Sequence, residues 1–342
     1  MKTTTYYLLF FTLILASCTP AQTPAPTPTK PQTLTILTHD SFAIGKDVIT
    51  AFETANNAKV DFIKSGDAGA MLNQAILTKD APLADMIFGV DNTLLSRALD
   101  ADIYEPYASP VLSDISDEFK LDSSNRALPL DYGDVCINYD KNYFAEKKLA
   151  VPQTFEELAK PAYKNLLVVE NPAISSPGLA FLLATHAHFG DGYLDYWKSL
   201  KANGVVVVDG WETAYYTNFS ASSGRGPQPM VLSYASSPAA EEGRTASIVA
   251  TDMCFRQVEF VGILKNGQNK LLAQKFVDFM LSQSFQEDMP LNMYVYPTNK
   301  NAKLPDVFVK YAQIAENPAV LSYAEIAKNR DTWIEAWTAA MK

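Results

Sequence analysis

The sequence predicts an α/β protein of two lobes, each a sheet flanked by helices, joined by a hinge of two strands. Short apolar runs alternate with amphipathic segments along most of the chain, which is typical of parallel sheets covered by helices. The chain also completes one such unit by Leu130, builds a second, and returns to the first near Phe255. A length of 342 residues with 48% hydrophobic content suffices for two buried cores.

Residues 1–33 are expected to lie outside these lobes. A short basic start, an apolar run over 6–15 and small residues before Cys18 are typical of a secretory signal peptide spanning 1–17. The tetrapeptide that ends at Cys18 (LASC) resembles a bacterial lipobox. It implies a lipid on Cys18, which would hold the mature protein at the outer face of the cytoplasmic membrane or in the periplasm. Residues 18–33 contain five prolines and predict a semi-extended tether.

The first lobe is predicted to comprise residues 34–130 and 255–342. Its strands are expected at 34–38, 60–63 and 85–89, and its helices at 44–54, 70–78, 92–99 and 269–281, with a last helix starting after Ser322. Ligands of parallel α/β sheets bind at the carboxyl ends of the strands. Those ends carry His39, Asp67 and Asp91 in this lobe.

The second lobe is predicted to comprise residues 131–254. Its strands are expected at 166–169, 205–208 and 230–233, and its helices after Thr154, at 177–189, at 193–201 and after Trp211. A surface loop is expected at 220–229 because this segment is rich in Ser, Gly and Pro. The hinge strands are expected at 128–139 and 256–264, where the chain crosses between the lobes.

A turn from strand to helix at 171–178 is the first candidate for a ligand site. Ser175 or Ser176 is placed to cap the helix, and Pro177 suits its first turn because a proline has no N–H to leave unpaired. A helix start offers free N–H groups and partial positive charge to an anion. On this motif alone, a capping role without any ligand stays open.

Aromatic rings and carboxylates gather at the other expected strand ends. Trp211, Tyr215 and Tyr234 suit stacking on a flat ring or contact with a cation. Asp67 and Asp91 would favour positive charge. Any one of these aromatic residues could equally be a core residue. Together the two sets predict a ligand with a cationic ring and an anionic tail.

Short segments at these places follow the order seen in one known family. They are 38–42 (THDSF), 67–73 (DAGAMLN), 84–95 (ADMIFGVDNTLL), 130–133 (LDYG), 175–179 (SSPGL), 209–215 (DGWETAY), 231–238 (VLSYASSP) and 296–297 (YP). In this order they resemble the thiamine-binding periplasmic proteins of ABC transporters. The resemblance extends from Leu34 to the last helix.

This resemblance implies a type II periplasmic-binding-protein-like fold and a solute-binding lipoprotein that delivers thiamine or thiamine phosphates to an ABC permease. By position, Asp67 and Ala68 would contact the ligand from the first lobe. The opposite wall would be formed by Ser175, Ser176, Trp211, Tyr215, Tyr234, Ala235, Ser236 and Ser237. The serines, Trp211 and Tyr234 would hold the hydroxyl or phosphate end, and His39 and Tyr294 complete the expected set.

Three positions depart from the family pattern. His39 and Ala240 stand where the family has tyrosines, and Tyr294 stands where it has a tryptophan. Two of these changes reduce ring stacking, and His39 adds a titratable group. A cationic ligand would oppose protonation of His39, so binding is expected to weaken at acid pH. The ligand could therefore be thiamine, a phosphate ester or a pyrimidine fragment.

Two other functions stay open. Tyr215 and Tyr216 resemble the paired ligands of a ferric-ion-binding protein of the same fold, although neighbours on a helix point about 100° apart. A secreted hydrolase would need a nucleophile and a base, but the sequence has no Gly-x-Ser-x-Gly elbow, and His39 and Asp40 would point to opposite faces of a strand. His186 and His188 lie in an apolar helix and are expected to be structural. No catalytic residue, no metal and no cofactor are expected.

The net charge and the cysteines of the chain limit the partners that can be expected. A formal net charge of −10 argues against nucleic acid, whose binders present basic surface. Cys136 and Cys254 could form a disulfide in an oxidising compartment or remain buried thiols, and spacing does not decide between these. A monomer is expected.

Overall fold

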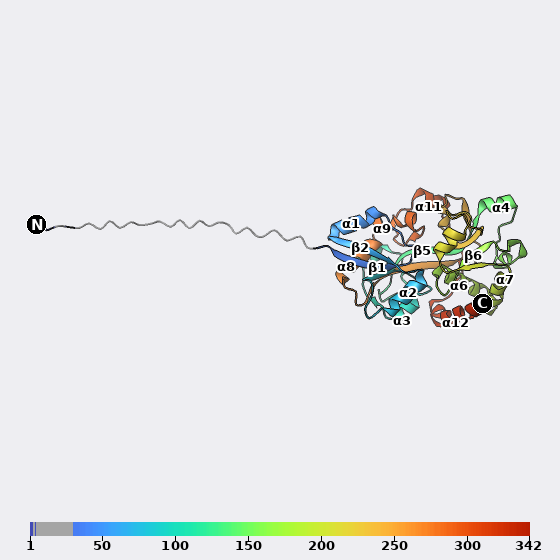
Figure 1. Ribbon diagram of the computed structural model, residues 1–342, viewed down its shortest axis with the longest axis horizontal. Helices are drawn as coiled ribbons and strands as arrows, with labels where there is room; N and C mark the ends of the chain where they lie inside the picture. Colours follow the sequence, from blue (N-terminus) through green and yellow to red (C-terminus); the bar gives the residue numbers. More distant parts are fainter. Residues whose placement is uncertain (3, 5–29) are drawn as a thin grey trace. The chain divides into compact units, whose positions relative to one another are not determined.

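A mixed sheet of 11 strands runs through residues 32–342 of the computed structural model, which describes residues 1, 2, 4 and 30–342 (Figure 1). The main order of the strands is β2-β1-β3-β10-β5-β8-β6-β7. Most of the predicted signal peptide, Cys18 and most of the tether lie outside the described residues. No helix in the described part of the chain is both long and apolar enough to span a membrane.

The first third of the sheet is parallel, as predicted. It contains β1 (Gln32–Thr38), β2 (Ala58–Lys64) and β3 (Met86–Asp91), which alternate with α1 (Lys46–Asn56), α2 (Ala68–Leu77) and α3 (Leu95–Asp100). β1 and β3 carry runs of apolar side chains that are buried on both faces, whereas the edge strand β2 alternates between buried and exposed positions, and each helix buries one apolar stripe. β1 begins at Gln32, so it takes up the last two residues of the predicted tether.

Two long antiparallel strands form the middle of the sheet. β5 (Leu128–Asp140) pairs with β10 (Phe255–Leu264), at the two places where the sequence predicts the chain to cross between lobes. A disulfide between Cys136 and Cys254 ties β5 to the residue just before β10. The predicted lobe boundaries themselves stay a prediction.

The rest of the sheet follows β5. It contains β8 (Met230–Tyr234), β6 (Leu167–Glu170) and β7 (Val206–Val208). Three short strands lie off this main path: β4 (Tyr104–Glu105) pairs with β10, and β9 (Thr245–Ile248) and β11 (Tyr296–Pro297) pair with β5. The helices of this region are α4 (Lys141–Lys147), α5 (Phe155–Leu158), α6 (Ser176–Phe189) and α7 (Tyr193–Ala202). The helix expected after Trp211 is a π-helical turn, Thr213–Asn218. Short 3₁₀ turns span Pro110–Asp114, Asp117–Phe119, Pro161–Tyr163, Gly190–Gly192 and Ser237–Ala239.

The last quarter of the chain is helical. It forms α8 (Lys270–Leu281), α9 (Gln283–Gln286), α10 (Met289–Asn292), α11 (Asp306–Tyr311) and α12 (Tyr323–Met341). α12 begins as predicted, because the Ser322 side chain accepts a hydrogen bond from the Glu325 N–H. Its Trp337 ring meets the ring of Trp197 on α7 edge to face, with centroids 5.4 Å apart. The end of the chain therefore packs against a helix of the predicted second lobe.

The two faces of the sheet carry separate cores. One core contains residues of α2, α3, α6, α7 and α12, and the other contains residues of α1, α8 and α9. Figure 1 shows α1 and α9 above the sheet and α2, α3 and α12 below it.

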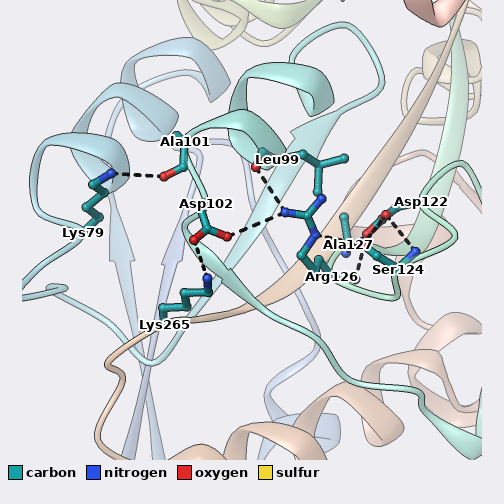
Figure 2. Close-up of polar contacts among 9 residues, drawn as sticks. All are labelled: Lys79, Leu99, Ala101, Asp102, Asp122, Ser124, Arg126, Ala127 and Lys265. Carbon is teal, nitrogen blue, oxygen red and sulfur yellow. Dashed lines mark hydrogen bonds and ion pairs between the residues drawn. The ribbon is translucent and has the colours of Figure 1, made fainter.

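A polar network joins four loops at the edge of the sheet where β3 starts and β10 ends (Figure 2). Asp102 accepts a hydrogen bond from Lys265 Nζ at 2.5 Å and lies 3.8 Å from Arg126 Nη1, which also donates to the Leu99 carbonyl. Lys79 Nζ donates to the carbonyl of Ala101 at 3.3 Å. These ion pairs are largely exposed, so each contributes little to stability. They fix loops at the sheet edge opposite the cavities described next.

Candidate functional site

Three adjoining cavities lie where β1, β2, β6, β7 and β8 end, and Ser41 and Trp211 line all three. The largest measures about 240 Å³ and the others about 40 and 20 Å³. Because they share these walls, they form one cleft. Its position matches the rule that α/β sheets bind ligands at the carboxyl ends of their strands.

Asp67 connects the two sides of the cleft. It caps α2, where its Oδ1 accepts a hydrogen bond from the Ala68 N–H at 2.7 Å. Its Oδ2 accepts the Trp211 N–H from the opposite side at 3.0 Å. Burial raises the pKa of Asp67, and the N–H groups of Trp211 and Ala68 partly offset that rise.

A second contact lies beside Asp67. The Gly69 N–H donates to the Ile174 carbonyl at 2.9 Å. A methyl group at Gly69 would come within 2.5 Å of that oxygen, so the close approach requires glycine. The two predicted lobes therefore touch at the cleft in this structure.

Trp211 is held in a fixed orientation. Its ring stacks on Tyr215, with centroids 4.9 Å apart and planes at 16°. Its Nε1–H donates to Ser233 Oγ at 2.9 Å, and Ser233 Oγ lies 2.9 Å from Ser237 Oγ. Tyr215 is 1% exposed, so it supports the indole from behind.

The narrower part of the cleft is aromatic. Tyr216, Tyr234 and Tyr294 line it together with Trp211. Tyr294 has a left-handed backbone with φ of 56°, and Ser236 Oγ donates to its carbonyl at 2.5 Å. The Tyr234 hydroxyl donates to Gln257 Oε1 at 3.0 Å. The bond to Gln257 orients the Tyr234 ring, and the bond from Ser236 holds the backbone that carries Tyr294.

Three acids form a row on the three middle strands beneath this aromatic part. Glu259 on β10 is the register partner of Asp91 on β3 and of Asp131 on β5, so the three side chains share one face of the sheet. All are more than nine-tenths buried. Burial raises the pKa of Asp91 to about 7, and burial beside Glu259 raises the pKa of Asp131 well above its usual value.

His39 joins this row to the cleft. Its Nε2 lies 3.4 Å from Glu259 Oε1, and its Nδ1 lies 2.9 Å from Ser41 Oγ. Burial disfavours the charged imidazolium, but the carboxylate of Glu259 outweighs this, and the pKa of His39 is raised. His39 and Glu259 both line the two smaller cavities.

Most of the predicted site residues meet at the cleft. His39, Asp67, Ala68, Ser176, Trp211, Tyr234 and Tyr294 line it. Tyr215, Ala235, Ser236 and Ser237 are buried behind this lining. Ser175 precedes α6 at 2% exposure, and its Oγ has no hydrogen-bond partner among the described residues. The ligand-binding roles of all twelve remain predictions.

Sequence reasoning missed two lining residues that the structure makes prominent. Ser41 follows directly on the predicted strand end, and only its contact with His39 distinguishes it. Glu259 stands alone among apolar residues in a strand, and a lone acid in such a run was the available signal.

The open alternatives can be compared with this geometry. Tyr216 is 44% exposed whereas Tyr215 is buried, and their ring planes lie at 84°, so they do not converge on one ion. Within the described residues, no group of three or more His, Cys, Asp or Glu side chains is placed to hold a metal. His188 pairs with Glu156 at 3.2 Å, and the His186 ring packs on Trp333. The Ser41–His39–Glu259 chain has the order of groups of a hydrolytic triad with the ring nitrogens exchanged.

Comparison with known proteins agrees with the resemblance seen in the sequence. The family described as bacterial extracellular solute-binding protein matches residues 81–328. The thiamine-binding periplasmic protein of Escherichia coli (strain K12) is 31% identical, over 93% of this chain and 95% of that protein. A solved structure titled periplasmic thiamin binding protein superposes with a TM-score of 0.81 at 28% identity and covers 94% of this chain and 99% of its own. The ferric binding protein from Campylobacter jejuni, with a TM-score of 0.73 at 17% identity over 90% of this chain and 99% of its own, shares the fold.

These likenesses confirm the predicted fold class, a type II periplasmic-binding-protein-like α/β fold. They also confirm the resemblance on which the expected ligand rests.

Proposed function

Because the chain belongs to the family of bacterial extracellular solute-binding proteins, we propose that it captures thiamine or a thiamine phosphate outside the cytoplasm and delivers it to an ABC permease. Members of this family are components of transport rather than enzymes. The names of the thiamine-binding relatives support the choice of ligand. In this proposal a lipid on Cys18 and the tether 18–33 keep the monomeric protein close to its permease.

The residues that line the cleft are the main observation that supports the proposal. Its walls present the rings of Trp211, Tyr234 and Tyr294 beside the acids Asp67 and Glu259. Among the described residues that line it, none is lysine or arginine. A flat ring with a positive charge suits such walls, because aromatic faces and carboxylates both attract cations.

Titration calorimetry with the mature chain tests this function. We expect one thiamine to bind per chain with a Kd of about 1 μM or tighter. The affinities for the monophosphate, the diphosphate and the separate pyrimidine then show how much the tail and the rings of the ligand each contribute to binding. Binding of none of the four ligands would contradict the proposal.

Two further measurements address the alternatives. Ferric ion should produce no tyrosinate charge-transfer band, since Tyr215 and Tyr216 do not converge. Thiamine phosphates recovered after long incubation should be unchanged. Phosphate release that depends on Ser41 would favour the hydrolase, whose only support is the Ser41–His39–Glu259 chain.

A further inference from the structure

The row of Asp91, Glu259 and Asp131 is costly for the folded protein. Like charges directly opposite on neighbouring strands destabilise a sheet, and burial penalises each ionised carboxylate further. Both carboxylate oxygens of Asp131, which is 1% exposed, lack a hydrogen-bond partner within the described part of the chain. Asp91, by contrast, accepts hydrogen bonds from Thr93 and Gln257. A strained polar cluster of this kind is usually kept for function.

The row is open to the cleft at one point. Glu259 lines the two smaller cavities, whereas Asp91 and Asp131 line none of the three. The Nε2 atom of His39, which is 6% exposed, lies beside Glu259 without hydrogen-bond geometry. A cavity and the imidazole of His39 thus meet at the central carboxylate.

We propose that Glu259 is the counter-ion for the cationic ring of the bound ligand, and that capture of the cation releases a proton from the acid row or from His39. The inference deepens the proposed function and rests on it, because it assumes that a cation with a flat ring enters this cleft. It also assigns a ligand class, since neutral molecules of the same shape would lack this attraction.

The charge balance of the row explains why a proton would be released on binding. Because Asp91 has a pKa of about 7 and that of Asp131 is higher than usual, the row holds protons near neutral pH. A cation beside Glu259 stabilises ionised neighbours and destabilises protonated His39, so both kinds of group lose protons on binding. Affinity should then rise with pH between about 6 and 8.

Other charges around the row must be counted with it. Titratable groups from each element packed around the row act on it or on His39. They are Lys64 at the end of β2, Asp67 at the N-cap of α2, Asp91 of β3, Asp131 of β5, Tyr234 of β8 and Glu259 of β10. Lys64 is the cation of this set, and it donates to the Asp40 carbonyl at the exposed rim. The cation that faces Glu259 most closely is therefore His39.

Calorimetry of the full mature chain in buffers of different ionisation enthalpy measures the number of protons released on binding. At pH 7 we expect thiamine to release roughly half to one proton per chain. An isosteric analogue in which a neutral thiophene replaces the thiazolium ring should release none. Thiamine binding without proton release would overturn the inference and leave the proposed function intact.

Substitution of the central acid gives the second test. E259Q keeps the shape of the side chain and should weaken thiamine binding about thirtyfold or more, while affinity for the neutral analogue changes less than about threefold. E335Q, an equal change at an exposed position of α12, is the matched control and should behave as wild type.

A variant that leaves the cleft lining intact keeps the test valid if E259Q does not fold. D131N removes one carboxyl group that can hold a proton, and this residue lines none of the cavities. The variant should therefore release fewer protons on binding thiamine and bind the neutral analogue normally. Unchanged proton release in D131N would refute the row as a source of the proton, and unchanged thiamine affinity in a folded E259Q would refute Glu259 as the counter-ion. Failure of the wild-type chain to bind thiamine, either of its phosphates or the separate pyrimidine would instead refute the proposed function.

Discussion

At the scale of single residues, Trp211 gives the sharpest test of the cleft. Its indole stacks on Tyr215, meets the Tyr216 ring edge to face, and donates its Nε1–H to Ser233 Oγ at 2.9 Å. Trp211→Phe removes the bond and keeps an aromatic ring. We expect thiamine affinity to fall about fivefold, since a hydrogen bond contributes about 1 kcal/mol and here fixes a ring that lines the cleft.

The chain offers a matched control at Trp197. This indole is fully buried in the core, and its Nε1–H also donates to a hydroxyl, Thr185 Oγ1, at 2.9 Å. Trp197→Phe should lower the free energy of unfolding by about 1–3 kcal/mol and leave thiamine affinity unchanged. Chemical denaturation and calorimetry on both variants separate the effects. Equal affinity losses in the two would show that Trp211 acts only through stability.

Single residues also show how far sequence can predict a site. His39, Asp67 and Trp211 were predictable because each follows a strand of clear pattern. Glu259 was not, because its place depends on pairing with Asp91 and Asp131, which lie more than a hundred residues away in the chain. The burial of Tyr215 could not be predicted either, because a π-helical turn decides which of two adjacent tyrosine rings faces the cleft.

At the scale of elements, the start of α6 differs from an ordinary capped helix. Ser175 occupies the N-cap position but makes no capping hydrogen bond, and its buried Oγ is unpartnered within the described residues. Ser175→Ala should therefore cost less stability than the loss of an ordinary helix cap, because no capping bond is lost. If the hydroxyl serves the tail of the ligand, affinity for thiamine and its phosphates should fall about fivefold.

The start of α12 supplies the contrasting case. Ser322 Oγ accepts the Glu325 N–H at 3.2 Å, so Ser322→Ala should cost about 1 kcal/mol of stability and leave ligand affinity unchanged. Thermal unfolding and calorimetry on the two serine variants give the comparison. A loss of stability without loss of affinity in Ser175→Ala would mean that this serine is only structural.

Elements with strong periodicity were predictable, and short ones were not. The strands and helices of the first third agree with their predicted positions within three residues. β4, β9 and β11 were missed because two to four residues carry no pattern of their own and become strands only by pairing with β10 or β5. The parallel order was right for β1 to β3, but the middle strands that cross the molecule are antiparallel to their neighbours.

At the scale of the whole molecule, buried titratable groups accumulate around the middle of the sheet. Asp91, Asp131 and Glu170 all have pKa values raised chiefly by burial, and the pKa of His39 is raised by Glu259 against the effect of its own burial. Glu170 is fully buried, and neither of its carboxylate oxygens has a partner in the described chain. The folded protein therefore binds protons that the unfolded chain would have released.

This surplus of bound protons predicts how stability depends on pH. A group whose pKa is higher in the folded state stabilises the fold below its unfolded pKa, and the stabilisation is lost as pH rises through the folded pKa. For Asp91 the change from 3.8 to about 7 is on the order of 4 kcal/mol, lost between about pH 4 and 7. His39, Asp131 and Glu170 act in the same direction. The ligand-free protein should thus have a higher Tm at pH 5 than at pH 8.

Asp91→Asn separates this contribution from the rest. The amide cannot ionise, so the fall in Tm between pH 5 and 8 should be smaller in this variant than in wild type, whereas Asp61→Asn at an exposed position of β2 should keep the full slope. A Tm that rises steadily from pH 5 to 8 would show that these acids are ionised in the folded state. The same series with saturating thiamine should show a larger shift in Tm at pH 8 than at pH 5, because the bound cation stabilises the ionised acids that destabilise the empty cleft.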